Sequence, residues 1–348
     1  MREENNSDFL SFENLYKGLK KSCRNVRWKT SVTQYEVNGL KNTAKIIIDI
    51  QNSKYRISEY QVFEIFEPKR RTITATRIKD RQLQRSLCDN YLYDALTKSF
   101  IYDNCACQIG KGTYFAINRL KTHLHKYYHK NRTNDGYFLK CDISHFFDSI
   151  NHEIAKEVIK KRVKNNDAFR LVCDIIDSFG GDVGIGLGSQ VSQLIALTLL
   201  DDMDHMIKER LHVKHYVRYM DDFILIHKDK EYLKYCLQEI SSHLCSIGLK
   251  LNKKTSLQTI HNGVPFLNWR YVLTNTGAVK MFQNKRRFRA KISKLKKMRN
   301  LYEAGRLTLD ELSQSLDGMV AHVMHCSCDV PIRKLESASG IISSIKLR

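Results

Sequence analysis

The sequence predicts an α+β fold in which helices alternate with short antiparallel strands. Apolar residues recur at helical spacing within residues 8–50 and again within 280–302. The stretch 60–76 alternates apolar and polar residues around a turn, and 214–227 places two β-rich runs on either side of a polar pair, so both predict hairpins. The chain has 348 residues, 42% of them hydrophobic, and can bury a core that supports two or three lobes around one site.

The expected elements follow one another without a linker. Only three prolines occur, and no Gly/Ser-rich segment or internal repeat separates the elements, so we expect lobes of one compact unit. In chain order we expect amphipathic helix within 8–50, a hairpin over 60–76 that turns at Pro68-Lys69, a helix over about 80–99, a strand over 137–142, a helix over 151–163, a hairpin over 214–227, a helix over about 231–246, and strands near 249–251 and 266–272. The stripe of the first segment is expected from Phe12, Leu15 and Leu19 and then from Leu40, Ala44, Ile47 and Ile48.

The charge of the chain predicts a polyanionic partner. The formal net charge is +21, from 58 Lys and Arg against 37 Asp and Glu, which is far more than solubility requires. Nucleic acid is the leading candidate and an acidic membrane surface is the second. No run of 18 apolar residues occurs, and the first residues lack the pattern of a signal peptide, so we expect a soluble, cytoplasmic protein.

The segment that follows Gly277 is the most basic part of the chain. Residues 280–299 hold ten basic side chains and no acidic one, while Phe288, Ile292, Leu295 and Tyr302 keep a narrow apolar stripe. Such a helix could lie on a membrane or bind a calmodulin-like partner, but its stripe is thin and lacks Trp. A helix that follows a phosphate backbone fits the pattern better.

The ten cysteines predict free thiols. They are scattered through a long chain without an export signal, which argues against a disulfide scaffold. The two close pairs are Cys105/Cys107 and Cys326/Cys328, each with one residue between its members, whereas a zinc site favours two to four. Histidines beside the second pair do not outweigh that spacing, so we expect no zinc site.

The sequence Tyr219-Met220-Asp221-Asp222 is the strongest chemical signal. It falls at a predicted hairpin tip, and Asp142 ends an earlier predicted strand. Adjacent carboxylates repel each other, and divalent cations neutralise them most readily. Two metal ions about 4 Å apart could activate an attacking oxygen and stabilise the leaving oxygens of a phosphoryl transfer. An aspartate pair on a loop is as often structural as functional, so the neighbouring residues must decide.

Those neighbours resemble the reverse transcriptases. Tyr219-Met220-Asp221-Asp222, followed by Phe-Ile-Leu-Ile, resembles the polymerase signature of that family. The other motifs resemble the family's in order: Glu67-Pro68-Lys69-Arg70-Arg71, Asp80 to Gln84 with Gly110 to Thr113, Asp142 to Ile150, Gly186 to Gln193, Gly248 to Thr255, and Val264 to Trp269. Asn268 departs from the usual Phe-Leu-Gly of the primer grip. The resemblance covers about residues 10–330 and implies a right-hand polymerase fold with fingers, palm and helical thumb.

The resemblance also implies roles for individual residues. Two Mg²⁺ ions, with Mn²⁺ as the alternative, would be held by Asp142, the carbonyl of Ile143, Asp221 and Asp222. The incoming nucleotide would meet Lys69, Arg71, Phe147, Leu187, Gly188, Gln193 and Lys254, with Phe147 as the steric gate against a ribose 2′-OH. Primer and template would meet Tyr219, Met220, Phe266, Leu267, Lys285, Arg286, Arg287 and Arg289. By contrast, we expect Phe146 to be a core aromatic.

The same resemblance suggests boundaries and partners. Fingers with N-terminal helices would span 1–135, the palm 136–277 with a helical insertion at about 151–183, and the thumb 278–348. No room is expected for a ribonuclease H, maturase or endonuclease domain after about residue 335. Expected partners are a structured or template RNA, the RNA–DNA hybrid, dNTPs and an accessory protein.

The biological setting is left between two alternatives. Leu187-Gly188, with Ser192-Gln193 in place of the common Ser-Pro, resembles the enzymes of diversity-generating retroelements, which make errors at template adenines. The short architecture is also similar to bacterial reverse transcriptases of antiphage defence, where synthesis can be templated, untemplated or protein-primed. A third alternative, from another class, is a non-catalytic RNA-binding scaffold, against which the intact aspartates argue.

Overall fold

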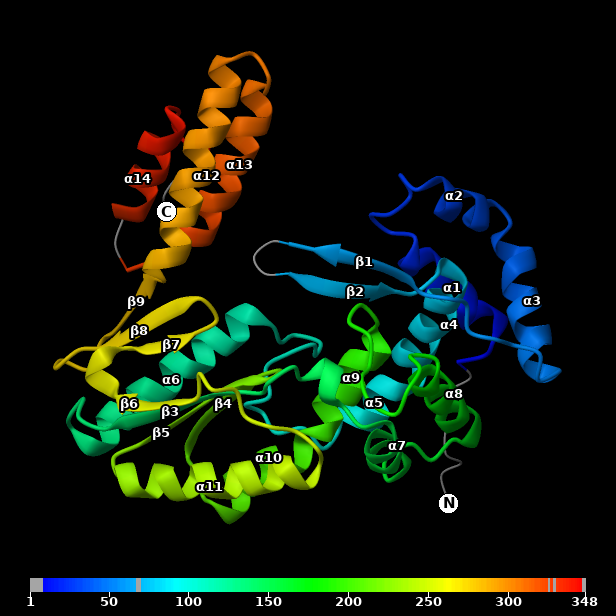
Figure 1. Cartoon of the computed structure of the whole chain (residues 1–348), viewed down its shortest axis with the longest axis horizontal. Coiled ribbons are helices and arrows are strands. Elements are labelled where there is room, and N and C mark those ends of the chain that lie inside the picture. Colours follow the sequence, from blue (N-terminus) through cyan, green and yellow to red (C-terminus); the bar gives the residue numbers. More distant parts are fainter. Residues whose placement is uncertain (1–8, 67–69, 325, 328–329, 346–348) are drawn as a thin grey trace.

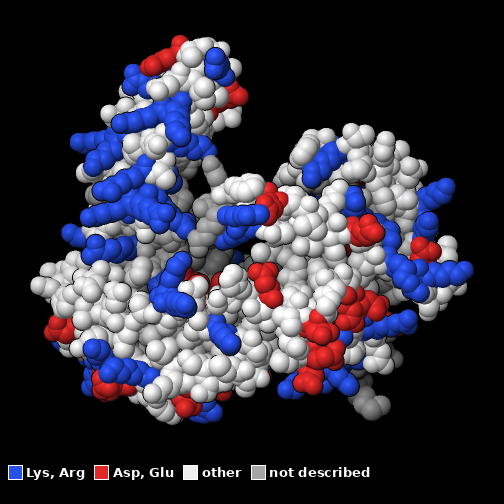
Figure 2. Space-filling view, in the orientation of Figure 1, with Lys and Arg blue, Asp and Glu red and all other residues white. Residues whose placement is uncertain are grey.

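The computed structural model describes residues 9–66, 70–324, 326–327 and 330–345, and it has the predicted α+β fold. A lobe with N-terminal helices and a β-hairpin stands on one side, a column of three helices stands on the other, and a four-stranded sheet lies below and between them (Figure 1). The surface is hollowed between the helical column and the lobe that carries the hairpin (Figure 2).

The four-stranded sheet is antiparallel and buried on both faces. Its order is β4-β5-β3-β6, and its strands are β3 (Tyr137–Asp142), β4 (His215–Tyr219), β5 (Asp222–His227) and β6 (Ser256–Thr259). Leu139 and Phe223 pack into the core on one face, where α11 (Lys230–Ser246) covers the sheet. Phe138 and Ile224 pack on the other face, under α6 (Thr113–Asn131). The predicted strand at 137–142 and hairpin at 214–227 are therefore confirmed.

The second sheet supports the helical column. It consists of β7 (Val264–Phe266), β8 (Trp269–Leu273) and β9 (Val279–Gln283), paired in that order. The strand expected over 266–272 is thus divided, because Leu267 and Asn268 both have left-handed φ values of 48° and 75° and form a turn. The strand expected near 249–251 is only a bridge between Leu251 and Ile143, and β6 forms later in the chain.

The helical column has a small core of its own. Its helices are α12 (Lys285–Glu303), α13 (Leu309–Val323) and α14 (Val330–Ser339). Leu295 of α12 is fully buried, with Phe288 and Ile292 partly buried beside it, whereas Tyr302 is 38% exposed. A capping box between Thr308 and Glu311 starts α13. In the described part of the chain, no helix is both long and apolar enough to cross a membrane.

The N-terminal helices differ from the predicted single stripe. They are α1 (Phe12–Ser22), α2 (Thr30–Val37) and α3 (Gly39–Gln51). Leu40 and Ile48 were expected on the buried face of α3 but are 60% and 55% exposed. The buried face instead holds Gly39, Thr43 and Ile46, and the Thr43 hydroxyl accepts a hydrogen bond from Gln82 Nε2 at 2.8 Å. Hydrophobic periodicity does not detect such a buried polar contact.

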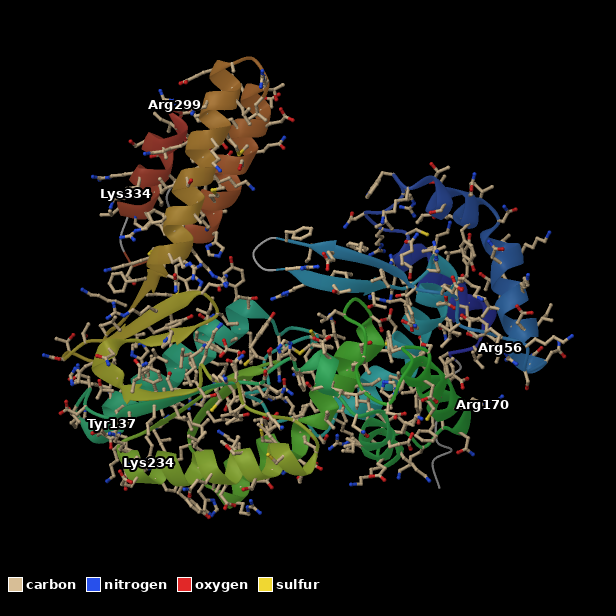
Figure 3. The ribbon with its side chains drawn as sticks, viewed as in Figure 1. Arg56, Tyr137, Arg170, Lys234, Arg299 and Lys334 are labelled. Atoms are coloured by element: carbon tan, nitrogen blue, oxygen red, sulfur yellow. The ribbon has the colours of Figure 1, made fainter. Side chains whose placement is uncertain are left out.

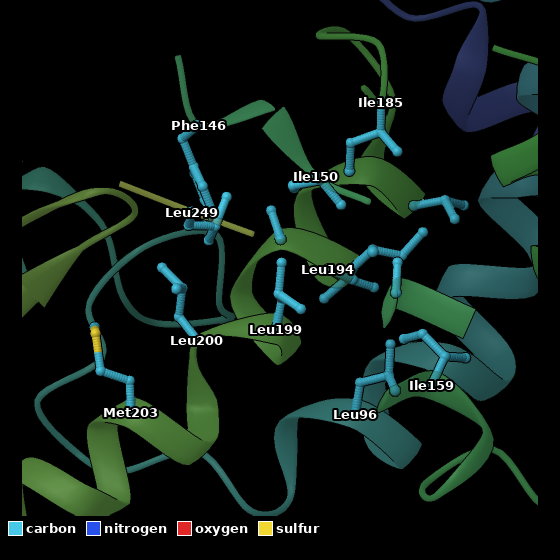
Figure 4. Close-up of a cluster of buried hydrophobic side chains, with 14 of the residues drawn as sticks. Leu96, Phe146, Ile150, Ile159, Ile185, Leu194, Leu199, Leu200, Met203 and Leu249 are labelled. Carbon is cyan, nitrogen blue, oxygen red and sulfur yellow. The ribbon is translucent and has the colours of Figure 1, made fainter. Parts of the chain in front are cut away.

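The hairpin and the helices of the main core complete the fold. The hairpin pairs β1 (Gln61–Ile65) with β2 (Arg71–Ala75); its tip, including Pro68 and Lys69, lies outside the described residues. The core helices are α4 (Ile78–Leu87), α5 (Tyr93–Thr97), α7 (His152–Lys160), α8 (Asn166–Asp177), α9 (Gln190–Leu199) and α10 (Asp201–His205). Arg56 and Arg170, from the segment after α3 and from α8, border a surface groove far from the sheet (Figure 3). Leu96, Ile159 and Leu194 from three of these helices meet in the core (Figure 4).

Candidate active site

Strand register brings the predicted carboxylates together. Asp142 at the end of β3 lies opposite Asp222 at the start of β5, and Tyr219 pairs with Asp222 across the hairpin. Met220 and Asp221 form the two-residue turn between the strands, and Met220 takes a left-handed φ of 57°. Asp142, Asp221 and Asp222 therefore gather at one end of the sheet.

A buried ion pair fixes the turn from beneath. Arg218 is fully buried, and its Nε donates to Asp204 Oδ1 at 2.7 Å. Its guanidinium also donates to the carbonyl of Met220 at 3.0 Å. Tyr216 donates its hydroxyl to the same Asp204 oxygen at 2.6 Å. Because removing one partner would leave an uncompensated buried charge, this pair holds the turn in one conformation.

The local environment opposes ionisation of the aspartates. Burial raises the pKa of Asp222 to about 6, although the Lys140 ammonium opposes the shift. Burial likewise raises the pKa of Asp221; the charge of Asp142 adds to this, and the guanidinium of Arg71 opposes it. Carboxylates that are both buried and mutually repelled gain stability from a bound cation.

Lys140 supplies one such positive charge. Its Nζ donates to both oxygens of Asp222, at 2.9 and 3.1 Å, and to the carbonyl of Pro265 in β7 at 3.2 Å. In the residues that the structure describes, no three Asp, Glu, His or Cys side chains converge closely enough to form a ready metal site. The available donors are nonetheless all hard oxygens on electrostatically strained carboxylates, which fits Mg²⁺.

The backbone beside Asp142 is held by the segment that follows α11. Asn252 donates its amide to the Asp142 carbonyl at 2.7 Å, and Ser144 donates to Lys250 at 2.9 Å. This bridge does not use the carbonyl of Ile143, the predicted metal ligand. Lys254 is exposed two residues beyond Asn252, and its amide donates to the Asn252 side chain at 3.0 Å. The fold brings Lys254 near the end of β3, but no described contact joins its side chain to the aspartates.

The hairpin strand β2 packs directly on the loop before α9. Thr74 donates its amide to the Leu187 carbonyl at 3.0 Å. Gly188 has a φ of +130°, and a Cβ there would lie 3.2 Å from the Thr74 carbonyl oxygen. A Cβ on Gly186 would lie 2.7 Å from the Thr74 Cβ. These glycines therefore allow the close approach of loop and hairpin. Gln193 lies half-buried in the first turn of α9.

The two arginines at the start of β2 have different surroundings. Arg70 forms a 2.7 Å ion pair with Glu64 across the hairpin. Arg71 is exposed, and its charge partly offsets the rise in the pKa of Asp221. Of the two predicted triphosphate contacts, Arg71 therefore acts electrostatically on the aspartates, and Lys69 lies outside the described residues.

The adjacent phenylalanines after β3 point to different environments. Phe146 is 4% exposed, so the prediction that it is a core residue is confirmed. Phe147 is half-buried at the start of a 3₁₀ turn, and the centroid of its ring lies 5.5 Å from that of the Phe146 ring. Its carbonyl accepts a hydrogen bond from Ile185 at 2.9 Å, which fixes it beside the glycine loop.

The predicted primer contacts divide into buried and exposed groups. Phe266 is 1% exposed, so its side chain belongs to the core, and only the backbone of this segment could meet a primer. Leu267 is half-buried on the following turn, and Tyr219 shares a 3.4 Å hydrogen bond with Thr113. The exposed basic residues occupy the first turns of α12 and are Lys285, Arg286, Arg287 and Arg289. Positive charge at a helix N-terminus opposes the helix dipole and favours an anionic partner.

Comparisons with known proteins identify the family. The family model for reverse transcriptase (RNA-dependent DNA polymerase) matches residues 67–277, more than half of the chain. The chain belongs to the reverse transcriptase family. The predicted family is thereby confirmed. No curated protein matches the sequence.

Solved structures show the same fold. The reverse transcriptase is similar to apo telomerase from Candida tropicalis, with a TM-score of 0.52 and 17% identity over 84% of this chain and 61% of that one. It is also similar to telomerase from Candida albicans in complex with a TWJ fragment of telomeric RNA, with a TM-score of 0.53 and 14% identity over 90% of this chain and 60% of that one. The chain thus spans about 60% of the length of these telomerase chains.

Sequence reasoning missed three residues that shape the reverse transcriptase site. Lys140 lies two residues before Asp142 on the same face of β3, so strand periodicity alone could have found it. Arg218 and Asp204 come from a strand and a helix that only the fold brings together, and no sequence signal links them. Of the close cysteine pairs, Cys105 is buried and Cys107 exposed, and Cys328 lies outside the described residues.

Proposed function

We propose that this reverse transcriptase extends a 3′-OH with deoxynucleotides on an RNA template. The observation that carries the proposal is the register that sets Asp142 opposite Asp222, with Asp221 in the adjoining turn, where the charge of Arg71 acts on it. Asp142, Asp221, Asp222 and the Ile143 carbonyl would hold two Mg²⁺ ions. When bound, such ions activate the attacking oxygen and stabilise the leaving phosphate oxygens.

The other residues act by positioning and by charge. Arg71, with Lys69 on the same hairpin, neutralises the triphosphate, as a guanidinium can do with two parallel hydrogen bonds. Phe147 excludes a 2′-OH, and the Leu187-Gly188 loop supports the base pair. We assign Gln193 and Lys254 to the same nucleotide pocket. Holding the reacting groups in line accounts for a large part of the rate in phosphoryl transfer.

The primer would lie between the palm hairpin and the helical column. Tyr219 and Met220 support its 3′ end, and the backbone near Phe266 and Leu267 grips its strand. Its phosphates contact the basic residues in the first turns of α12, which are Lys285, Arg286, Arg287 and Arg289. Fingers over 1–135, palm over 136–277 and thumb over 278–348 are the boundaries that we propose. The partners are the template RNA, its RNA–DNA hybrid and dNTPs, together with an accessory protein.

A diversity-generating retroelement is the setting that we propose. Leu187 presents an apolar side chain where many relatives have glutamine, which removes an amide from the nucleotide pocket and weakens discrimination between bases. Sequencing of the DNA product tests this setting, which predicts errors confined to template adenines. Accurate copying, or synthesis without a template, favours the antiphage setting.

Primer extension tests the function. We would supply an RNA template, a DNA primer, Mg²⁺ and four dNTPs to the wild type, to Asp221→Ala/Asp222→Ala and to Asp182→Asn. Asp182 is an exposed carboxylate on the loop before Gly184 and serves as a control for charge. The proposal is supported if the wild type and Asp182→Asn make template-complementary DNA and Asp221→Ala/Asp222→Ala does not. Failure of the wild type to extend, even with its native RNA, would favour the RNA-binding scaffold.

A further inference from the structure

The helical column carries a basic groove on the side opposite the hairpin. The groove has a volume of about 450 Å³ and lies between α12 and α14. Lys296 and Ile292 line it from α12, and Arg333 and Lys334 line it from α14. Lys334 points away from the β1–β2 hairpin (Figure 3), and basic side chains cover this side of the column from base to tip (Figure 2).

The charges of this groove are not neutralised by the protein. In the described part of the column, neither Lys296 nor the two α14 side chains form an ion pair; the recorded pair there is Arg299–Glu303 at 2.7 Å. Nearby carboxylates have other partners. Glu336 accepts the amide of Ser343, and Asp317 accepts the hydroxyls of Ser343 and Ser344. The groove therefore keeps its full positive charge for an external anion.

A second hollow continues the groove toward the base of the column. Lys334 borders both, and the lower hollow, of about 720 Å³, adds the aromatic side chains Phe282 and Phe288. Basic side chains next to aromatic rings are the usual surface for a single strand, because phosphates meet the charges and bases stack on the rings.

The template–primer duplex cannot account for this surface. A duplex held between the hairpin and the column contacts the face of the column that looks toward the hairpin, whereas Lys334 points the other way. A membrane would need a broad exposed apolar face beside the charges, and of the apolar residues in the groove only Val330 is exposed, at 53%. The remaining chemistry is a second length of polyanionic strand.

We propose that the groove between α12 and α14 binds the phosphate backbone of an RNA segment that lies outside the polymerase cleft. This proposal rests on the proposed function, because it assigns a second site to the RNA that the enzyme copies. It gives the enzyme a way to hold its own RNA while the duplex moves through the cleft. The contacts are with phosphates, so affinity for this segment falls steeply with salt.

Two RNA probes test the second site. One probe is a short RNA template with a DNA primer, and the other carries the same duplex plus a 5′ RNA stem-loop with a single-stranded joint. The variant Lys296→Gln/Arg333→Gln/Lys334→Gln removes three charges from the groove. The variant Lys41→Gln/Lys45→Gln/Lys54→Gln removes the same charge from exposed positions in and after α3.

We expect the groove variant to bind the extended probe about tenfold more weakly at ~0.15 M salt, with a salt slope reduced by about 2. Its affinity for the short probe and its rate of primer extension on that probe should be unchanged. Equal loss on both probes, no loss on either, or the same loss in the α3 variant would overturn the proposal. The surface would be assigned to a membrane if the wild type and the α3 variant bind phosphatidylserine vesicles, while the groove variant does not bind them but still binds RNA normally.

The two proposals fail in different ways. If the wild type does not extend the short probe, the polymerase function fails, while the affinities of the two probes can still be compared. If extension is normal and the groove variant binds both probes like the wild type, only the second RNA site fails. Thermal unfolding of each variant checks that the exposed substitutions leave the fold intact.

Discussion

Charges are organised in opposite ways in the four-stranded sheet and in the helical column. At the sheet, Lys140 contacts Asp222, and the buried Arg218 contacts Asp204, so each charge depends on a neighbour within hydrogen-bonding distance. In α12 the basic residues from Lys285 to Arg289 are exposed and none forms an ion pair with a described carboxylate. Buried, coupled charges give large and non-additive effects, whereas exposed ones give small effects that salt screens.

The largest expected effect follows from Asp221→Asn. We expect primer extension to fall about 1,000-fold or more, because losing a metal ligand removes several kcal/mol of transition-state stabilisation. The same change removes a repelled, buried charge, so the thermal unfolding temperature in EDTA should rise by roughly 2 °C. Calorimetry and extension rates measure both, with Asp182→Asn as the control. A lower unfolding temperature would contradict the argument that the aspartates oppose one another.

Arg71→Ala should reduce kcat/KM for dNTPs by about 10- to 100-fold, the loss of one or two charge-assisted hydrogen bonds. Its neighbour offers a matched control, because Arg70 is already paired with Glu64 at 2.7 Å. Arg70→Ala should change kcat/KM by less than about threefold. Steady-state extension at varied dNTP concentration measures kcat/KM for both variants. Equal losses in the two variants would show that the hairpin acts on the dNTP only through its total charge.

Much of the four-stranded sheet was predictable, because its signals are local. Alternating residues around Asp221 and Asp222 identify a hairpin, and motif order places Asp142 beside it. The burial of Thr43 in α3 was not predictable, because its hydrogen-bond partner Gln82 lies 39 positions away in the chain. The Arg218–Asp204 pair was missed for the same reason. Lys140 is different: its spacing from Asp142 was visible, but its contact depends on the register between β3 and β5.

Lys140→Met tests the coupling between the ammonium and the carboxylates. The change leaves Asp222 without its partner, so the free energy of unfolding in EDTA should fall by about 1–3 kcal/mol. The ammonium also competes for the oxygens that a metal would use, so half-maximal stabilisation should need several-fold less Mg²⁺ than in the wild type. Chemical unfolding at varied Mg²⁺ measures both quantities. Lys140→Arg should retain the wild-type stability, and an unchanged Mg²⁺ requirement in Lys140→Met would rule out competition.

The raised pKa of Asp222 predicts a pH dependence of the metal effect. Its folded pKa is about 6, above the ordinary 3.8. This group alone therefore destabilises the metal-free protein as pH rises through that interval, because the folded state binds the proton more tightly. Mg²⁺ needs the ionised form, so its stabilising effect should increase by a few degrees between pH 5 and pH 7.5. Asp222→Asn should remove most of that increase; equal Mg²⁺ shifts at both pH values in the wild type would contradict the assignment.

The smallest single effects are expected in α12. Arg286→Gln and Arg287→Gln should each weaken binding of a template–primer duplex about two- to fivefold at ~0.15 M salt and reduce the salt slope by about 0.9. Because both side chains are exposed and independent, the affinity of the double variant for the duplex should fall by the product of the two single factors. Fluorescence anisotropy at several salt concentrations measures this. A double variant that loses no more affinity than either single variant would mean that the two arginines share one phosphate. The helical column would then resemble the four-stranded sheet in the coupling of its charges.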